Sequence, residues 1–307
     1  MDNDNQSTNP PVDKEGFPKY GSVKSLYGNT YWGRLSRSYR IYHPLNLIYS
    51  DAQLMEMKKE LDTYIKTGVT TKTNKELWDM HYILESNLHP ETGQPISKLF
   101  RWSAYCPVNI PIIIGLSVLP PTPFNQIFFQ TINQSYNFGI NFSNSTSSNQ
   151  KTTSELLTSY GLAVTCAIVG SVGLRKILER RVNSSSSAFG RAVLLSTPFI
   201  GLVFANTVNL LFSRSKELVE GIPVNDPRTG EQVPNFKSLT AGRSSLEESL
   251  LLRMAIPIPS FFLPMFASRY AKRNFKFYTN SKPLQLLYDG SIAYFTIWAS
   301  LVFAMSF

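Results

Sequence analysis

The chain has 307 residues, with 30 Lys and Arg against 21 Asp and Glu, a formal net charge of +9, and only 17% charged residues. A typical soluble domain carries roughly 25% charged residues, so this deficit argues against an ordinary soluble protein. Two cysteines, Cys106 and Cys166, lie within apolar runs, which excludes a disulfide-rich scaffold and a cysteine-ligated metal cluster.

The N-terminal segment is polar and contains scattered Pro and Gly. Residues 1–28 are therefore expected to be disordered. The opening stretch Met1–Pro11 is rich in Asn, contains acidic residues and has no apolar core, so neither a secretory signal nor an Arg-rich transit peptide is expected there. Targeting to an organelle would have to depend on the mature sequence.

A small helical domain is predicted over residues 29–101, at or near a membrane surface. Its first helix, Thr30–Tyr42, alternates aromatic residues with arginines. This pattern fits equally a helix on an anionic membrane surface and a helix packed on its own domain. The next two helices begin at Ser50 and at Thr73, and Gly68 and Pro90 end them.

A turn, His89–Gly93, follows these helices. A single histidine in a turn is more often a local hydrogen-bonding residue than a metal ligand. The other two histidines, His43 and His81, are isolated in the sequence, so no metal site is predicted.

The rest of the chain, residues 102–307, contains long runs without charge. Residues 1–101 hold 13 basic and 12 acidic residues, whereas residues 102–150 hold none. About 20 apolar residues suffice for a helix to cross a bilayer. We therefore predict an all-α polytopic membrane protein with about five transmembrane helices. The predicted spans are 103–119, 156–174, 192–213, 250–268 and 286–307.

Several spans contain residues that are unusual within a bilayer. Pro107, Asn109 and Pro111 interrupt the first, which predicts a helix broken around Asn109 that forms a binding site; a packed proline kink is the alternative. Asn206 and Asn209 share one face of the third span, as contacts between helices or with a ligand. The neutral segment Asn133–Asn137 is a candidate re-entrant or interfacial segment.

The loops carry their charge asymmetrically. Five Lys and Arg against one Glu follow the second span, at 175–191, and five against one Asp follow the fourth, at 269–289. The positive-inside rule places both loops, and with them the N-terminal domain, on one side of the membrane. Because topology explains most of the +9 charge and no nucleic-acid-binding motif is present, nucleic acid is not an expected partner.

The order and spacing of several short motifs resemble the sideroflexins, multi-pass proteins of the mitochondrial inner membrane, from about Thr30 to the last span. One departure precedes the fourth span, where a Ser-Arg pair is usual and Leu252-Arg253 stands here. The motifs are Trp32-Gly33-Arg34, the HPETG of His89–Gly93, Pro107-x-Asn109-x-Pro111, the NQSYN of Asn133–Asn137, Glu155-Leu156-Leu157 with Tyr160, Ala205-Asn206 with Asn209 and Arg214, and the GIPVND of Gly221–Asp226.

The resemblance implies a carrier for small neutral amino acids, serine foremost, with alanine, glycine or cysteine as further candidates, and it places the positive side in the mitochondrial matrix. No cofactor is expected, and the absence of paired carboxylates or a nucleophile with a base argues against an enzyme. The alternatives are a tricarboxylate or iron-citrate carrier and an assembly factor for respiratory complexes, whose interface would be the face Leu77–Leu88. The predicted substrate contacts are Asn109, Asn133, Gln134, Asn137, Asn206 and Asn209. The predicted structural or gating residues are His89, Pro90, Thr92, Gly93, Pro107, Pro111, Arg214 and Arg253.

Overall fold

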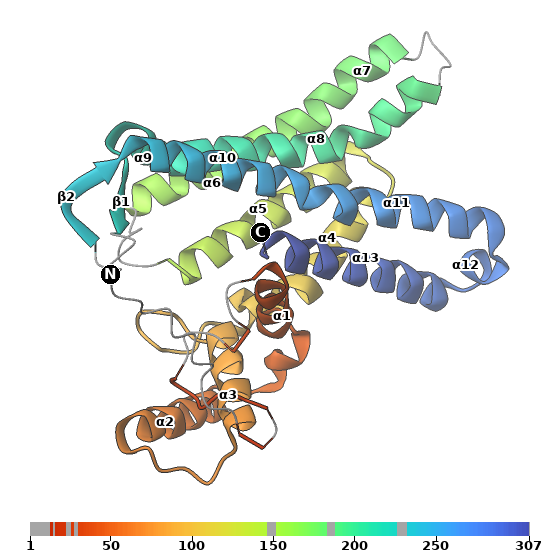
Figure 1. Ribbon diagram of the computed structural model, residues 1–307. Helices are drawn as coiled ribbons and strands as arrows, with labels where there is room; N and C mark the ends of the chain where they lie inside the picture. Colours follow the sequence, from red (N-terminus) through yellow and green to blue (C-terminus); the bar gives the residue numbers. More distant parts are fainter. Residues whose placement is uncertain are drawn as a thin grey trace, which may run out of the picture. The chain divides into compact units, whose positions relative to one another are not determined.

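The computed structural model describes residues 13–14, 16–22, 26–27, 30–145, 152–182, 188–225 and 232–306. The chain divides into two compact units, Met1–Pro107 with Met305–Phe307, and Val108–Ala304 (Figure 1). The division falls close to the predicted boundary after Arg101. Helices dominate both units, which confirms the all-α fold.

The first unit contains short helices joined by tight turns. A capping box joins Ser50 to Gln53 at the start of α2, and Gly68 ends this helix in the left-handed conformation at φ 70°. A second capping box joins Thr73 to Glu76 at the start of α3. Both predicted helices are thus confirmed. The elements are α1 (Tyr31–Ile41), η1 (Pro44–Ile48), α2 (Asp51–Thr67), α3 (Asn74–Asn87), η2 (Lys98–Phe100), η3 (Trp102–Ala104) and the start of α4 (Tyr105–Ser117).

An apolar core lies between α2 and α3 of this unit. Leu54 and Leu61 of α2 pack there against Leu77, Leu84 and Leu88. The face Leu77–Leu88 is therefore buried within the unit. Its interpretation as an interface for an assembly partner is wrong, because these side chains already have intramolecular neighbours.

Two of the three arginines of α1 pair with acidic residues of the neighbouring helix α3. Arg37 pairs with Glu85, and Arg40 pairs with Asp79. These two charges are neutralised within the unit, which favours the packed interpretation of α1 over a lipid-facing one. Trp32, in contrast, is 71% exposed.

Part of the segment predicted to be disordered packs on α3. The Trp78 indole donates to the Pro18 carbonyl at 3.0 Å, and the Tyr20 amide donates to Asn74 at 3.2 Å. Contacts with α3 thus hold residues 13–22 where the structure describes them. The rest of residues 1–28, apart from 26–27, lies outside the described residues.

The second unit consists mainly of long helices. A small antiparallel hairpin, β1–β2, connects α9 to α10, and the sequence analysis did not predict it. The last motif residue, Asp226, lies outside the described residues. The elements are the remainder of α4, α5 (Pro123–Ser143), α6 (Thr153–Ile168), the π-helical η5 (Val169–Gly173), α7 (Leu174–Val182), α8 (Ala188–Ser213), α9 (Ser215–Glu220), β1 (Ile222–Asn225), β2 (Gln232–Ser238), α10 (Leu239–Ala255), α11 (Pro257–Asn274), α12 (Lys276–Asn280) and α13 (Lys282–Ala304).

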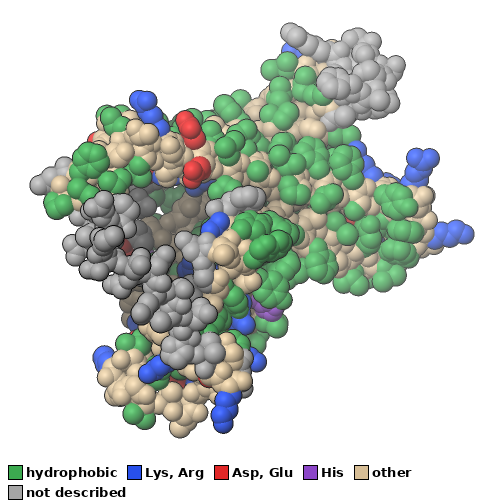
Figure 2. All heavy atoms as spheres, viewed as in Figure 1, with side chains coloured by type: hydrophobic (Ala, Val, Ile, Leu, Met, Phe, Trp, Pro, Cys, Tyr) green, Lys and Arg blue, Asp and Glu red, His purple; other side chains and the backbone are tan. Residues whose placement is uncertain are grey.

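Four helical stretches of the described chain are long and apolar enough to cross a membrane: Ser154–Arg180, Val193–Phe212, Leu239–Asn274 and Lys282–Ala304. They correspond to the last four predicted spans, and the first corresponds to a shorter apolar helix, Trp102–Ser117. Large apolar side chains face outward from these stretches, as expected for contact with lipid. Examples are Leu157, Phe204, Phe266 and Phe295. Figure 2 shows such side chains covering much of the second unit.

The expected break in the first span is absent. α4 (Tyr105–Ser117) runs through Pro107, Asn109 and Pro111 without interruption, so the prediction of a broken helix is wrong. Pro107 lies in the first turn, where a backbone N–H has no helical acceptor in any case. Pro111 removes only one helical bond, the one to the Pro107 carbonyl.

Candidate functional site

The site is built on α5, the helix formed by the neutral segment. Thr122 caps its N-terminus by accepting from the Asn125 amide at 3.2 Å, and Pro123 occupies the first turn. The motif Asn133–Asn137 thus lies inside a 21-residue helix. The prediction of a re-entrant or interfacial segment stays open, because a helix of this length fits several positions relative to a membrane.

One face of α5 carries a row of buried amide side chains. Gln126, Gln130, Asn133 and Gln134 are each at most 5% exposed. Residues four, seven and eight positions apart share one face of a helix, so these amides form a continuous stripe, which we call the amide seam. Asn137, one turn further on, is half-buried on the same face.

Most polar atoms of the amide seam lack a hydrogen-bond partner among the described residues. They are both amide atoms of Gln126, Oε1 of Gln130, Nδ2 of Asn133 and Nε2 of Gln134. Leaving a buried donor or acceptor unpaired costs roughly 1–3 kcal/mol. A stripe of unpaired amide groups therefore lowers the stability of the folded protein. It provides donors and acceptors that a polar ligand or water can satisfy.

One amide of the seam contacts α8 at Pro198, a proline inside that helix. The Gln130 amide donates to the Pro198 carbonyl at 3.0 Å. Pro198 has no N–H, so the Leu194 carbonyl one turn earlier loses its helical donor. Thr197 and Arg175 replace that donor, at 2.8 and 3.2 Å. Side chains from α5 and α7 therefore both hydrogen-bond to the backbone of α8 around Pro198.

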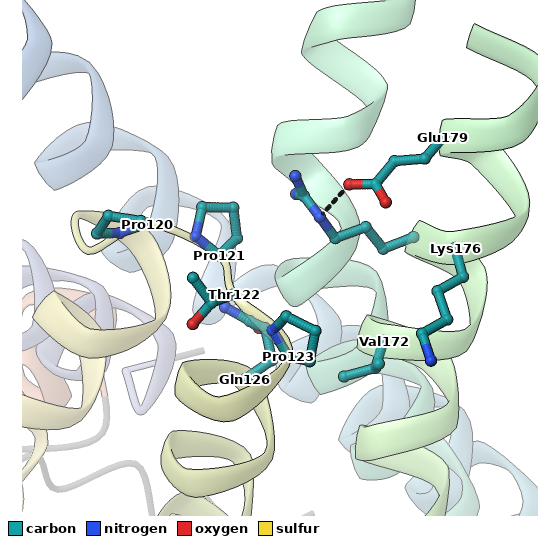
Figure 3. A pocket seen from close by; sticks show the side chains of 9 residues that line it. Pro120, Pro121, Thr122, Pro123, Gln126, Val172, Lys176 and Glu179 are labelled. Carbon is teal, nitrogen blue, oxygen red and sulfur yellow. Dashed lines mark ion pairs between the residues drawn. The ribbon is translucent and has the colours of Figure 1, made fainter. Parts of the chain in front are cut away.

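A pocket of about 310 Å³ lies at the N-terminal end of the seam. Gln126 lines it, so the pocket and the amide seam share a residue. Figure 3 shows the turn Pro120–Pro123 on one side and Lys176 and Glu179 of α7 on the other. Oε1 of Glu179 forms an ion pair with Nε of Arg175 at 2.8 Å. The lining residues are Pro120, Pro121, Thr122, Pro123, Gln126, Val172, Arg175, Lys176 and Glu179.

The predicted substrate contacts fall on three helices. Asn133 and Gln134 belong to the amide seam, and Asn137 extends it. Asn109 is buried on α4, and Asn206 and Asn209 lie half-buried on α8. The participation of these last three in one site with the seam stays a prediction.

The HPETG turn is held by local hydrogen bonds. Nδ1 of His89 accepts from the backbone amides of Glu91 and Thr92, each at 3.3 Å. Gly93 has φ 62°, and its carbonyl accepts from Lys58 at 3.2 Å. Pro90 lies within the same turn. The histidine thus acts as a turn-forming residue, while a gating role for the motif stays a prediction.

Arg214 links three helices of the second unit. It lies between α8 and α9 and donates to both carboxylate oxygens of Glu217, at 2.8 and 2.5 Å. It also donates to the hydroxyls of Ser249 at 2.7 Å and Ser245 at 2.9 Å on α10. This two-pronged geometry suits a guanidinium and not an ammonium group. Arg253 lies in the last turn of α10.

Gln126, Gln130 and the pocket residues of α7 are not among the contacts predicted from the sequence. The first two continue the spacing of Asn133 and Gln134 toward the N-terminus, a signal that was present in the sequence. Arg175 and Lys176 were assigned to a loop, but the helix continues through η5 into α7 and places them beside α5. In the described parts of the chain, no group of three or more His, Cys, Asp or Glu side chains is arranged to hold a metal ion.

Comparison with known proteins gives a consistent result. The family model described as "Sideroflexins" matches residues 24–307. A sideroflexin from Dictyostelium discoideum is 33% identical over 250 residues, which cover 81% of this chain and 75% of that protein. Sideroflexin-5 of Rattus norvegicus is 32% identical over 76% of this chain and 68% of its own length. Sideroflexin-1 of Mus musculus is 30% identical over 85% of this chain and 79% of its own length. No solved structure matches the chain.

Proposed function

Because the chain belongs to the sideroflexin family, we propose that it carries small neutral amino acids, serine foremost, across the mitochondrial inner membrane. The resemblance found in the sequence implies this substrate class. The observation that supports it is the amide seam of α5, with its unpaired donors and acceptors.

A small neutral amino acid is a zwitterion with a carboxylate, an ammonium and a short side chain. Amide side chains recognise such a molecule well, because each offers a carbonyl acceptor and an NH₂ donor without a fixed charge. The exposed polar groups of the substrate and the unpaired atoms of the seam satisfy one another. Binding thus removes part of the desolvation cost on both sides.

The orientation proposed for the chain follows from its basic segments. Arg269, Lys272, Arg273 and Lys276 precede or enter α12, and Figure 2 shows Lys and Arg side chains at this end of the second unit. The positive-inside rule places such segments, and the N-terminal unit with them, on one side of the membrane, and the family resemblance implies that this is the matrix side.

The test is uptake of labelled serine by liposomes that contain the purified protein, with a Gln134→Leu variant. Nε2 of Gln134 has no hydrogen-bond partner among the described residues, so removal of the amide is expected to leave thermal stability unchanged or raised. Uptake is expected to fall at least about tenfold if the amide contacts substrate.

Two variants accompany this experiment. Asn141→Leu removes an exposed amide from the same helix and is the matched control, with normal uptake expected. Asn109→Leu tests the predicted contribution of α4. No uptake by a folded wild-type protein would disprove the carrier function and favour the assembly-factor alternative, and normal uptake in Gln134→Leu would remove the seam from the site.

One observation favours the second candidate, a carrier of tricarboxylates or iron-citrate. Anion binding calls for Arg or Lys inside a cavity, and Arg175 and Lys176 line the pocket. Glu179 offsets one of these charges, which disfavours a trivalent anion. Inhibition of serine uptake by citrate at equal concentration would support this candidate over the neutral amino-acid carrier.

A further inference from the structure

We propose that the pocket at the N-terminal end of α5 recognises both charges of a zwitterion, with Lys176 binding its carboxylate and Glu179 its ammonium. The inference rests on the proposed function and assigns it a substrate-selecting site. The amide seam then receives the uncharged part of the substrate.

Arg175 is already engaged in the structure, which leaves Lys176 as the accessible cation. Arg175 forms an ion pair with Glu179 and donates to the Leu194 carbonyl. Lys176 is exposed, lines the pocket and has no ion-pair partner among the residues that the structure describes. An ammonium group binds a carboxylate without the strict geometry that a guanidinium requires.

Glu179 can accept a second cation. Only its Oε1 is paired with Arg175 Nε, while Oε2 has no hydrogen-bond donor in the described parts of the chain. The ammonium of a zwitterion is therefore attracted to Oε2. A plain anion is repelled by the same carboxylate, so Lys176 and Glu179 together favour zwitterions over simple carboxylates.

The wall of the pocket opposite α7 offers few polar groups to a ligand. Pro120, Pro121 and Pro123 have no backbone N–H to donate. The wall is stiff and mostly apolar, and polar recognition is left chiefly to Lys176, Glu179 and Gln126. A few placed polar groups in an apolar pocket are typical of small-molecule sites, and about 310 Å³ lies at the lower end of their range of roughly 300–1000 Å³.

The shared residue connects this pocket to the seam. Neither amide atom of Gln126 has a hydrogen-bond partner in the described parts of the chain, and the side chain is 1% exposed. A ligand held by Lys176 and Glu179 therefore lies next to the first amide of the seam. A lipid phosphate is the competing occupant of a basic pocket between membrane helices. It is disfavoured here because Glu179 repels a phosphodiester.

The test measures the KM of serine uptake in liposomes for wild type and Lys176→Gln. Lys176→Arg restores the positive charge, and Arg180→Gln is the control. Arg180 is exposed near the end of the same helix and does not line the pocket. We expect KM to rise about tenfold in Lys176→Gln with little change in kcat, and to recover in Lys176→Arg. Arg180→Gln should match wild type.

Two serine fragments test the zwitterion rule. Aminoethanol lacks the carboxylate and 3-hydroxypropionate lacks the ammonium, so neither should compete with serine in wild type. In Glu179→Gln, 3-hydroxypropionate should become a competitor, because the repulsive carboxylate is gone. Strong competition by either fragment in wild type would overturn the inference.

The outcomes separate the inference from the proposed function. If wild type transports serine and Lys176→Gln has an unchanged KM, the inference fails and the carrier function stands. If wild type transports nothing, both fail. If the Lys176→Gln defect occurs only in vesicles with phosphatidylglycerol and not in phosphatidylcholine alone, the pocket binds the headgroup of an anionic lipid and the inference is overturned.

Discussion

The backbones of Gly170 and Gly201 meet where the π-helical segment after α6 crosses α8. A Cβ placed on Gly170 would lie 2.8 Å from the Gly201 Cα, and one on Gly201 would lie 2.7 Å from the Ala167 carbonyl oxygen. Both distances are shorter than atomic contact allows. The crossing therefore requires glycine, and it lies next to the turn around Pro198 that Gln130 and Arg175 contact.

The crossing predicts the effect of one added methyl group. Gly201→Ala should lower the free energy of unfolding by about 1–3 kcal/mol or more, because the neighbouring atoms are backbone and cannot move aside cheaply. Gly161→Ala is the matched control, since its Cβ meets nothing within 4 Å. That variant should be neutral or stabilising by up to about 1 kcal/mol. Equal thermal melting of both variants in detergent would contradict the close crossing.

A buried carboxylate in α13 depends on hydroxyl donors. Asp289 is 2% exposed, and it accepts from Ser268 at 2.5 Å and from Tyr278 at 3.0 Å. Tyr278→Phe should destabilise the protein by roughly 1–3 kcal/mol, because a buried charged group loses a donor. The control is Tyr288→Phe, whose hydroxyl makes only a 3.4 Å bond to Ala267. A smaller loss of melting temperature in Tyr278→Phe than in the control would contradict this role.

Acid should weaken the first unit through His81. Burial lowers the pKa of His81 from 6.5, and the nearby Glu85 opposes this shift only in part. The unfolded state therefore binds the proton first, so stability is full above about pH 6.5 and declines as the pH falls toward the lowered folded-state value. Two further groups lie beside this pair: the Tyr20 hydroxyl contacts His81, and Arg37 pairs with Glu85.

The measurement for His81 compares melting temperatures at about pH 7.5 and about pH 5.5 for wild type and His81→Gln, which titrates no proton in this range. The loss on acidification should be smaller in the variant. An identical loss in both proteins would assign the pH dependence to other groups.

Replacing the glycine of the HPETG turn should lower the stability of the protein but leave serine uptake unchanged. Gly93→Ala places a Cβ in the left-handed region, and this atom would lie 2.1 Å from the Lys58 ammonium. The flexible lysine can move away, so the remaining cost is the backbone conformation, about 1 kcal/mol. The double variant with Lys58→Ala should still show that cost. Loss of serine uptake without loss of stability would instead indicate a gating role.

Local patterns were sufficient to predict the helices of the first unit. Capping boxes at Ser50 and Thr73 and the glycine stop at Gly68 act within one helical turn, and the structure contains all three. The apolar spans were predictable for a similar reason, because a bilayer demands a run of about 20 apolar residues whatever the packing. The break expected at Pro107–Pro111 failed because the cost of proline depends on its position in the helix.

The sequence by itself determined the family, the helical class and the position of the long apolar helices, since these follow from motifs and composition along the chain. Only the tertiary structure decided that Gln126, Gln130, Asn133 and Gln134 are buried together, that Arg175 caps the carbonyl freed by Pro198, and that Lys176 and Glu179 face a proline turn. Whether an amide is unpaired depends on which helix packs against its face, and contacts between distant segments set that packing.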